Sequence, residues 1–302
     1  MSKVVITGAA SNIGLALVDI CLKNNDEVIA LVRPNSKNNT KLINHPNLKV
    51  IAVDVCDIEN CNVKLDADIF YHLAWSGVER NIRNNPNVQL ANVKYTIDAI
   101  NLANRLGCKK FIGAGSQAEY GPKKDEIITE NTNIDPNIAY GVGKYTAGKF
   151  GKILCEGLNM EFNWARIFSV YGINDGDGTM ITSTMNKMIN NEPIDFTDAT
   201  QLWEYTYSTD CAKALYLIGK YGKNMETYNI STGDYHELRY YILKMKKIIN
   251  SDSILNFGAI KANGPQTNLA CNIDKLKNDT GFNPEISFDE GISLILKAKT
   301  HK

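Results

Sequence analysis

The stretch Val4-Val5-Ile6-Thr7-Gly8-Ala9-Ala10-Ser11-Asn12-Ile13-Gly14 joins an apolar run to a glycine-containing turn and the start of an amphipathic segment. Residues 4–6 are typical of a strand buried on both faces, and residues 13–22 predict a helix that packs against it. Gly8 permits a tight turn, Gly14 permits close helix–strand packing, and the free N–H groups that begin the helix attract a pyrophosphate. Ser11 stands where such loops usually carry glycine, and its Cβ reduces the space through which a pyrophosphate could approach the backbone. The alternative is an ordinary βα turn, but the context favours a dinucleotide-binding turn, with contacts from Gly8, Ala10, Ser11, Asn12, Ile13 and Gly14.

The next 160 or so residues continue this strand–helix alternation. Apolar, β-branched runs predict further strands at residues 28–32, 50–53, 69–73, 111–114 and 162–167. Segments with helical periodicity lie between them, at residues 88–106 and 140–158. Such alternation implies a parallel sheet with right-handed crossovers. We therefore predict an α/β protein, with a Rossmann doubly wound parallel sheet over residues 1–170 and a smaller C-terminal substrate-binding lobe over 171–302. About 204–230 of that lobe is expected to return to the sheet.

Composition excludes several classes of protein. The 302 residues contain 33 Lys plus Arg and 33 Asp plus Glu, which argues against a nucleic-acid binder or a protein held to membranes by charge. The seven cysteines are scattered without a Cys-x-x-Cys pair, so neither a disulfide framework nor a metal site is expected, and a reducing compartment fits best. The N-terminus shows no secretory signal, and no apolar run approaches the ~20 residues of a membrane span. The sequence predicts a cytoplasmic protein.

The end of the second predicted strand bears on which dinucleotide is bound. NAD sites of this class usually place Asp or Glu there, to accept from the ribose 2′-hydroxyl. Here the chain reads Leu31-Val32-Arg33-Pro34-Asn35-Ser36-Lys37, which contains no carboxylate. Arg33, with Ser36 or Lys37, would pair with a 2′-phosphate. We therefore expect NADP(H) in preference to NAD(H), unless Arg33 is simply a solvated residue. Asp54 and Val55 follow the third strand, where the adenine edge would lie.

The pattern Tyr-x-x-x-Lys occurs five times, so only its context identifies a functional pair. Tyr140 and Lys144 begin the helix after the fifth strand, flanked by the small residues Gly141 and Gly143. The other pairs, which begin at Tyr120, Tyr145, Tyr216 and Tyr240, lack that context. A lysine one helical turn after a tyrosine lowers its pKa from about 10, so that the phenol can exchange a proton with a ketone oxygen. Ser116, at the end of the fifth strand, would hydrogen-bond the reacting oxygen.

Further motifs extend along essentially the whole chain. They are His72-Leu73-Ala74, Asn92, Ser116-Gln117-Ala118-Glu119-Tyr120-Gly121, Tyr140-Gly141-Val142-Gly143-Lys144, Arg166-Ile167-Phe168-Ser169-Val170-Tyr171-Gly172 and Thr280-Gly281-Phe282-Asn283-Pro284. With these motifs the chain resembles an extended short-chain dehydrogenase/reductase of the NAD-dependent epimerase/dehydratase type. The resemblance implies a nucleotide-sugar substrate, cofactor contacts at Leu73, Ala74 and Asn92, and a homodimer formed through the helices at 88–106 and 140–158.

Ser116, Tyr140 and Lys144 do not by themselves select the reaction within such a family. The resemblance places an Asp-Glu pair after the serine in dehydratases, but Gln117 and Ala118 stand there, which disfavours elimination of water. An NADP-like site favours a reductase, which must exchange its cofactor, and therefore an enzyme similar to nucleotide-linked 4-keto-sugar reductases. An NAD-dependent C4 epimerase is the alternative enzyme, and a non-catalytic dinucleotide-binding redox sensor is the alternative of another class.

The candidates for substrate contacts are less specific. Trp75, Arg80 and Arg83 follow the fourth strand, and Gln117 follows the serine. Ser169 and Trp203 occupy positions at which the resemblance implies Asn and Arg. A tryptophan is more often a packing residue than a ligand contact. An arginine in such a loop is as often solvated as it is bound to a substrate.

Overall fold

The computed structural model describes residues 1–63, 65–124, 126–262, 264 and 267–300, and within them the central sheet has seven parallel strands. These strands are β1 (Lys3–Thr7), β2 (Glu27–Val32), β3 (Leu48–Ala52), β4 (Ile69–His72), β5 (Lys110–Ser116), β6 (Glu161–Ile167) and β11 (Glu226–Ile230). Their order is β11-β6-β5-β4-β1-β2-β3, so the chain begins near the middle and extends to one edge before it crosses to the other. The reversal between β1 and β4 opens a crevice at the carboxyl ends of the strands, where ligands of such sheets bind.

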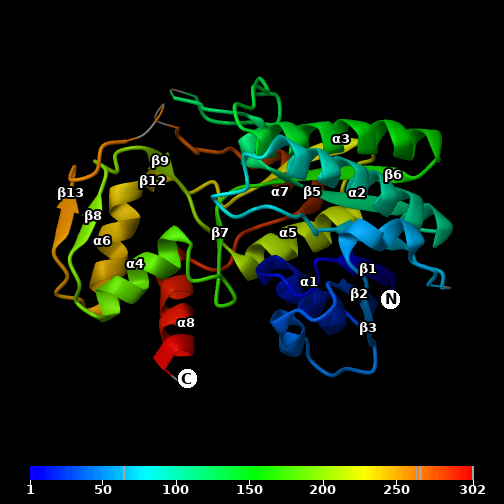
Figure 1. Ribbon diagram of the computed structural model, residues 1–302, viewed down its shortest axis with the longest axis horizontal. Coiled ribbons are helices and arrows are strands. Elements are labelled where there is room, and N and C mark those ends of the chain that lie inside the picture. Colours follow the sequence, from blue (N-terminus) through cyan, green and yellow to red (C-terminus); the bar gives the residue numbers. More distant parts are fainter. Residues whose placement is uncertain (64, 125, 263, 265–266, 301–302) are drawn as a thin grey trace.

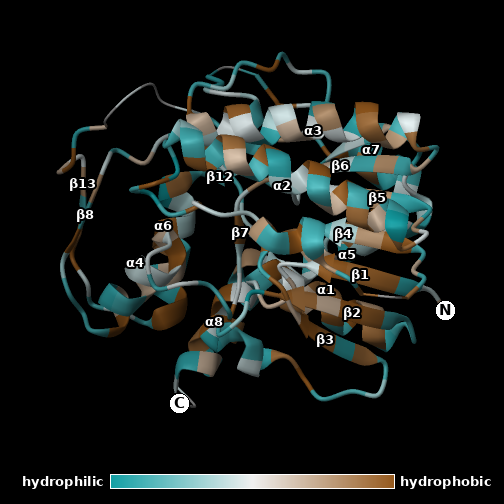
Figure 2. Cartoon of the chain, turned by 45° about the vertical axis from the view of Figure 1, so that its right-hand side comes forward, coloured by the Kyte–Doolittle hydropathy of each residue, from teal (hydrophilic) through white to brown (hydrophobic). Residues whose placement is uncertain are grey.

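Helices cover both faces of the sheet (Figure 1). The pair α2 (Pro86–Arg105) and α3 (Ala139–Gly157) packs on one face, and the pair α1 (Asn12–Lys23) and α5 (Ser208–Tyr221) packs on the other. Successive strand residues point to opposite faces, so Val5 belongs to the apolar core under α2 and α3, while Val4 and Ile6 belong to the other core. Burial on both faces explains why β1 and β2 are largely apolar, as Figure 2 shows in brown, whereas β3 lies at the edge of the sheet and keeps exposed residues.

The fold class predicted from the sequence is confirmed by this doubly wound sheet. After the lobe begins, the chain comes back to the sheet: α5 packs beside α1, and β11 pairs in parallel with β6 from Glu226 opposite Asn163 to Ile230 opposite Ile167.

The lobe has a small apolar core of its own. Its helices are α4 (Met180–Ile189), α6 (Leu238–Ile249) and α8 (Phe288–Thr300), and its short strands pair as β8 (Ile194–Phe196) with β13 (Leu255–Phe257) and β9 (Leu202–Trp203) with β12 (His236–Glu237). Aromatic side chains dominate this core, where Tyr205, Tyr241 and Phe288 contact one another edge to face or tilted. Two strands, β7 (Val170–Tyr171) and β10 (Thr206–Tyr207), lie between the lobe and the sheet, and α7 (Asp274–Thr280) packs against α5.

One tryptophan fills a gap that glycines leave between the sheet and α3. The indole of Trp164 on β6 lies against Gly113 and Gly115 of β5 and Gly148 of α3. A Cβ added at Gly148 would lie 2.8 Å from that indole, and one at Gly113 or Gly115 would lie closer still. The glycines therefore allow α3, which carries Tyr140, to sit close to the sheet.

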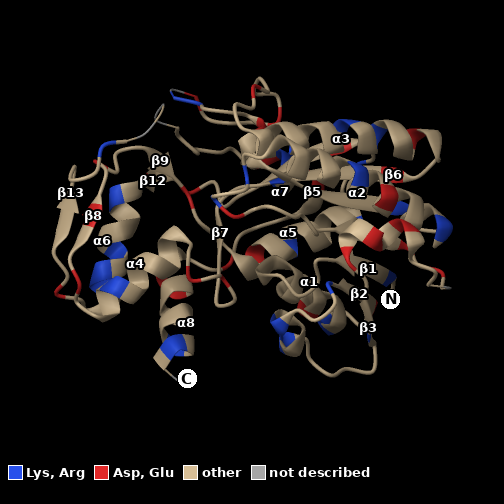
Figure 3. Ribbon diagram, viewed as in Figure 1, with Lys and Arg blue, Asp and Glu red and all other residues tan. Residues whose placement is uncertain are grey.

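The surface carries both signs of charge on both parts of the molecule, as Figure 3 shows. All seven cysteines are free thiols, and of these only Cys56 is exposed. In the described part of the chain, none of the helices combines the length and the apolar character that a membrane crossing requires.

Candidate active site

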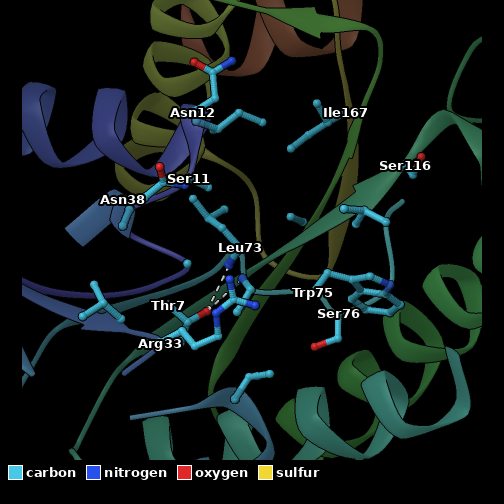
Figure 4. Close-up of a pocket in the computed structure, with 18 of the residues that line it drawn as sticks. Thr7, Ser11, Asn12, Arg33, Asn38, Leu73, Trp75, Ser76, Ser116 and Ile167 are labelled. Carbon is cyan, nitrogen blue, oxygen red and sulfur yellow. Dashed lines mark hydrogen bonds between the residues drawn. The ribbon is translucent and has the colours of Figure 1, made fainter. Parts of the chain in front are cut away.

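A cavity of 720 Å³ lies at the carboxyl ends of β1, β2, β4 and β5, at the point where the strand order reverses. Figure 4 shows Ser11, Asn38 and Arg33 on one side of this cavity and Trp75, Ser76 and Ser116 on the other. A cavity of this volume at the switch point of a doubly wound sheet suits a dinucleotide.

The glycine-containing turn forms the floor of the cavity. Gly8 has φ of +68°, and a Cβ there would lie 2.8 Å from the Ala74 nitrogen. A Cβ at Gly14 would meet the Gly8 carbonyl, so Gly14 brings α1 against the turn without itself lining the cavity. Ser11 has an ordinary φ of −77° and uses its hydroxyl as the N-cap of α1, accepting from the Gly14 N–H at 3.0 Å. A serine therefore replaces glycine here without backbone strain and still lines the cavity beside Ala10, Asn12 and Ile13.

The neighbouring strand is held to this turn by Thr7. Its hydroxyl accepts from the backbone nitrogens of Leu73 at 3.1 Å and Ala74 at 3.2 Å, and it also bonds His72 Nδ1 at 2.9 Å. Burial lowers the pKa of His72 to about 3, so the imidazole is neutral and structural. Leu73 and Ala74 both line the cavity.

The end of β2 supplies the polar groups expected around an adenosine ribose. Arg33 and Ser36 line the cavity, together with Asn38 and Asn39, whereas Lys37 does not. The Asn39 amide donates to the Arg33 carbonyl at 3.0 Å, which fixes the loop that follows β2. Asp54 and Val55, after β3, line the same end.

Tyr140, Lys144 and Ser116 meet at the opposite end, and theirs is the only Tyr-x-x-x-Lys pair of the five found in the cavity lining among the described residues. Lys144 is 3% exposed; its ammonium donates to the Ala114 carbonyl at 2.6 Å and lies 3.7 Å above the centre of the Trp75 ring. The Ser116 hydroxyl donates to the side-chain oxygen of Gln117 at 2.7 Å. The Lys144 ammonium also lies 5.8 Å from the centre of the Tyr140 ring, and the Ser116 hydroxyl is near enough to the Tyr140 phenol to influence its pKa, so the three side chains are neighbours.

Burial sets the proton affinities of this group. Burial lowers the pKa of the Lys144 ammonium to about 7, and the Glu119 carboxylate acts in the opposite direction. Burial raises the pKa of the Tyr140 phenol, whereas a hydrogen bond from Ser116 and the charge of Arg83 lower it. The buried phenol therefore holds its proton more tightly than a free tyrosine does, whereas the buried ammonium releases its proton more readily than a free lysine does.

A buried ion pair beneath Ser116 was not expected from the sequence. Glu119 belongs to the 3-10 turn η3 (Gln117–Glu119), is fully buried, and accepts from Arg166 Nε at 2.8 Å, from Trp164 Nε1 at 2.9 Å and from the Ser116 N–H at 2.8 Å. Arg166 also donates to the Tyr120 hydroxyl at 3.0 Å. This network fixes the turn that presents the Ser116 hydroxyl. Its sequence signal is an acidic residue three positions after a serine, which is the capping-box pattern.

Several residues predicted as contacts lie outside the cavity lining, for identifiable reasons. Asn92 uses its amide to bond the backbone of Ser76 at 2.8 Å in both directions, so it supports the loop after β4. Trp203 lies in β9 opposite His236 and packs against the two apolar cores it joins. Ser169 binds through its carbonyl to the Thr206 N–H, and Arg80 is exposed. Trp75 and Gln117 do line the cavity.

Three charged residues that the sequence did not single out as primary candidates, Glu79, Arg83 and Asp175, do line it. Arg83, rather than Arg80, faces the cavity from the segment before α2. Asp175 reaches it from the loop before α4 and accepts from the Asn12 amide at 2.6 Å. The local sequence carries no periodicity that would have distinguished any of these residues from its neighbours.

A doubly wound sheet with a cavity at its switch point is typical of proteins that bind dinucleotides. The family model described as the NAD dependent epimerase/dehydratase family matches residues 4–231, and the chain belongs to that family. It is accordingly an NAD(P)-dependent enzyme of the oxidoreductase type, as its resemblance to extended short-chain dehydrogenases predicted.

Relatives with several different activities are similar to it. The chain is 29% identical over 305 residues to a putative UDP-glucose 4-epimerase of Methanocaldococcus jannaschii, covering 97% of each chain. It is 26% identical to CDP-abequose synthase of Salmonella muenchen, covering 98% of each. The solved structure of UDP-glucose 4-epimerase from Thermotoga maritima with UDP-glucose superposes with a TM-score of 0.89 at 22% identity, covering 99% of this chain and 100% of that one, which shows the shared fold.

Proposed function

We propose that the protein is an NADPH-dependent reductase of a nucleotide-linked 4-keto (deoxy)sugar, assisted by Ser116, Tyr140 and Lys144. The observation that carries this proposal is the end of β2, where Arg33 and Ser36 line the cavity and no carboxylate occupies the position that would bind a ribose 2′-hydroxyl. A site for a 2′-phosphate favours NADPH, and a reductase oxidises NADPH in each turnover and must then exchange it.

The residues present fit such a cofactor. The turn from Gly8 to Ile13 would cradle the pyrophosphate, and a Cβ at Gly8 or Gly14 would disrupt this turn because it would clash with neighbouring backbone; Arg33 with Ser36 and Asn38 would hold the phosphorylated ribose. Lys144 would hold the other ribose, near the nicotinamide. When bound, the nicotinamide supplies the hydride.

The protein's own groups handle the proton. The Tyr140 phenol donates to the ketone oxygen as negative charge develops on it, and the nearby Lys144 ammonium favours the phenolate that results. The Ser116 hydroxyl releases the Gln117 oxygen, to which it donates at 2.7 Å, and donates to the same ketone oxygen instead. Gln117 then has a free carboxamide with which to bond a sugar hydroxyl. Because neither Gln117 nor Ala118 is an acid or a base, the site is not equipped for elimination of water.

Trp75 favours reduction over epimerisation. Its indole N–H donates to Gln89 at 2.8 Å, and its ring lies edge-on to Tyr140 with 6.2 Å between centroids. An epimerase must present both faces of one sugar carbon to a fixed hydride position, so the sugar needs room to turn. A locked indole beside the tyrosine reduces that room.

A C4 epimerase is the second candidate, because a putative epimerase is 29% identical over nearly the whole chain. An epimerase returns its hydride and retains its NAD. Stoichiometric dinucleotide that survives gel filtration would support the epimerase and contradict the reductase.

The reductase proposal is tested by mixing the protein with NADPH and a panel of CDP-, dTDP-, UDP- and GDP-linked 4-keto sugars. We expect one equivalent of NADPH to be oxidised for each ketone consumed with at least one of them, and no oxidation with Tyr140→Phe. Interconversion of C4 isomers without net oxidation would overturn the reductase in favour of the epimerase.

A homodimer is proposed as well. Apolar side chains on the outer surfaces of α2 and α3 are exposed, among them Leu90 at 67% and Ile153 at 65%. A second copy would cover them by packing the same two helices against their equivalents. Sedimentation should give a dimer for the wild type, and a shift to monomer for Ile153→Asp.

A further inference from the structure

Three consecutive residues before α2, Arg83, Asn84 and Asn85, each contact a different part of the molecule. Asn85 caps α2, accepting from the Asn87 N–H at 3.0 Å. Asn84 accepts from the N–H of Ala139 at 2.8 Å, which is the first residue of α3. The N-cap residue of α3, Ile138, has no side-chain acceptor to offer, so Asn84 supplies the cap from 55 residues away. This segment is therefore held against the start of the helix that carries Tyr140.

The third residue, Arg83, is directed at Tyr140 by these two anchors. Its guanidinium carbon lies 4.7 Å from the centre of the Tyr140 ring, and the side chain lines the cavity. Its Nε is buried and has no hydrogen-bond partner, and no carboxylate in the described part of the chain pairs with the guanidinium. The guanidinium therefore faces the aromatic ring without an ion-pair partner among the described residues.

A cation in this position distinguishes the two forms of the tyrosine. Over a neutral phenol it gains only the attraction of the ring quadrupole. A phenolate carries a full negative charge that spreads into the ring, so the same cation gains a direct charge–charge attraction. Lys144 also lies 5.8 Å from this ring centre, but its ammonium already donates to the Ala114 carbonyl and faces Trp75.

We propose that Arg83 is a positioning residue that stabilises the phenolate of Tyr140 as its proton leaves. The inference rests on the proposed role of Tyr140 in proton transfer, and it assigns to that step a second cation besides Lys144.

The other charged and hydrogen-bonding groups around Tyr140 do not replace the effect of Arg83 on the phenolate. From its own helix, Lys144 places its ammonium 5.8 Å from the ring centre; from the end of β5, Ser116 lowers the pKa of the phenol by hydrogen bonding. From η3, Glu119 opposes it, although the ion pair with Arg166 compensates much of that charge. Glu79 lines the same cavity but forms no ion pair with Arg83. Burial favours the neutral phenol, so a cation over the ring offsets part of that effect.

The first test measures ionisation of Tyr140 without any substrate. The protein is labelled throughout with 3-fluorotyrosine, whose more acidic phenol titrates where the fold is stable, and the Tyr140 fluorine resonance is identified by its loss in Tyr140→Phe. We expect Arg83→Met to raise the titration midpoint by about one pH unit, and Arg83→Lys to restore part of the difference. Arg80→Met is the matched control, because Arg80 is exposed and outside the cavity, and its midpoint should equal that of the wild type.

The second test is the pH profile of turnover by the holoenzyme in the alcohol-oxidising direction, where rate rises with the phenolate fraction. Arg83→Met should move the rising limb upward by the same interval, which is about tenfold less activity at a fixed pH below it. Equal midpoints in the wild type and Arg83→Met, equal shifts in Arg80→Met, or a wild-type Tyr140 that stays protonated until the protein unfolds would each overturn the proposal. Turnover failing in every protein would contradict the proposed reductase, whereas the fluorine titration would still decide the role of Arg83.

Discussion

The side-chain amide of Asn12 donates to Asp175 at 2.6 Å, and this contact joins the dinucleotide-binding turn to the loop that leads into the lobe. Burial raises the pKa of the Asp175 carboxyl from 3.8 to about 6. Above that pH the group is an anion that lines the cavity near the expected pyrophosphate position, so it should repel the cofactor.

Replacing Asp175 by Asn should therefore tighten dinucleotide binding at pH 7.5 by about three- to tenfold, because the amide keeps the bond from Asn12 and removes the charge. Wild-type affinity should rise as the pH falls through about 6, where Asp175 becomes neutral, and this dependence should be absent in the variant. Calorimetric titration with NADPH at pH 5.5 and 7.5 measures both effects. Asp177→Asn, two residues away and exposed, should behave as the wild type; a similar gain there would show that only the net charge of the loop matters.

The proposed NADPH preference depends on Arg33. Arg33→Ala should weaken NADPH binding by ~1–3 kcal/mol, the usual value of a charge-assisted contact, and should leave NADH binding nearly unchanged. Lys37→Ala removes a cation from the same loop that does not line the cavity, so both affinities should persist. Thermal-shift titrations with both dinucleotides make the comparison. Equal losses for the two cofactors would contradict a 2′-phosphate site.

Proton donation by Tyr140 predicts a specific kinetic loss. Tyr140→Phe should lower kcat by about 10²–10⁴-fold, the usual contribution of a positioned acid, with little change in NADPH affinity. Tyr145→Phe is the matched control, because Tyr145 lies on the same helix and packs beside Lys149 outside the cavity. Steady-state kinetics on both variants distinguishes the two positions. If Tyr140→Phe retained full turnover, another group would have to supply the proton.

Stability should depend on pH through a carboxyl that the mechanism does not use. Glu204 follows β9 and is fully buried, and this burial raises its pKa from 4.5 to about 8. The folded state therefore binds the proton more tightly than the unfolded state does, so its stabilising contribution is complete below about 4.5 and is lost as the pH rises to 8.

Glu204→Gln should remove that loss. The difference in unfolding free energy between this variant and the wild type should therefore shift in favour of the variant by about 3–5 kcal/mol between pH 5 and pH 8.5. Urea unfolding at the two values of pH measures the difference. The exposed Glu237 offers the control, because Glu237→Gln should follow the wild-type curve. Parallel curves for the wild type and Glu204→Gln would mean that the carboxyl is not held neutral in the fold.

The sheet and its long helices could be predicted because the local sequence decides them. Strands buried on both faces leave apolar runs, and α2 and α3 are long enough to show helical periodicity. The short elements of the lobe could not. β9 has two residues, and Trp203 is in a strand only because His236 lies opposite. α7 spans seven residues, too few for a periodic signal, although Gly281 with φ of +70° marks its end.

The same distinction applies to the cavity. Residues that extend from the ends of regular elements, such as Ser11, Ser116 and Tyr140, are found in its lining at the positions that the motifs indicated. Arg83 and Asp175 lie on loops whose direction is set by contacts with residues 55 and 163 positions away, so nothing local distinguished Arg83 from Arg80. Asn92 shows the opposite case, because its amide is used by the Ser76 backbone rather than by the cavity.

The indole of Trp164 and the glycines at positions 113, 115 and 148 depend on one another for packing. The three glycines leave space that the Trp164 side chain fills from a different strand. A larger residue at one of the glycine positions would therefore clash with the indole, and a smaller residue at position 164 would leave a void. In engineered chimeras, a graft of the helix that carries Tyr140 should therefore succeed only from donors that match all four positions. Other grafts would alter the distance between that helix and Ser116, and so impair chemistry without touching any residue of the cavity.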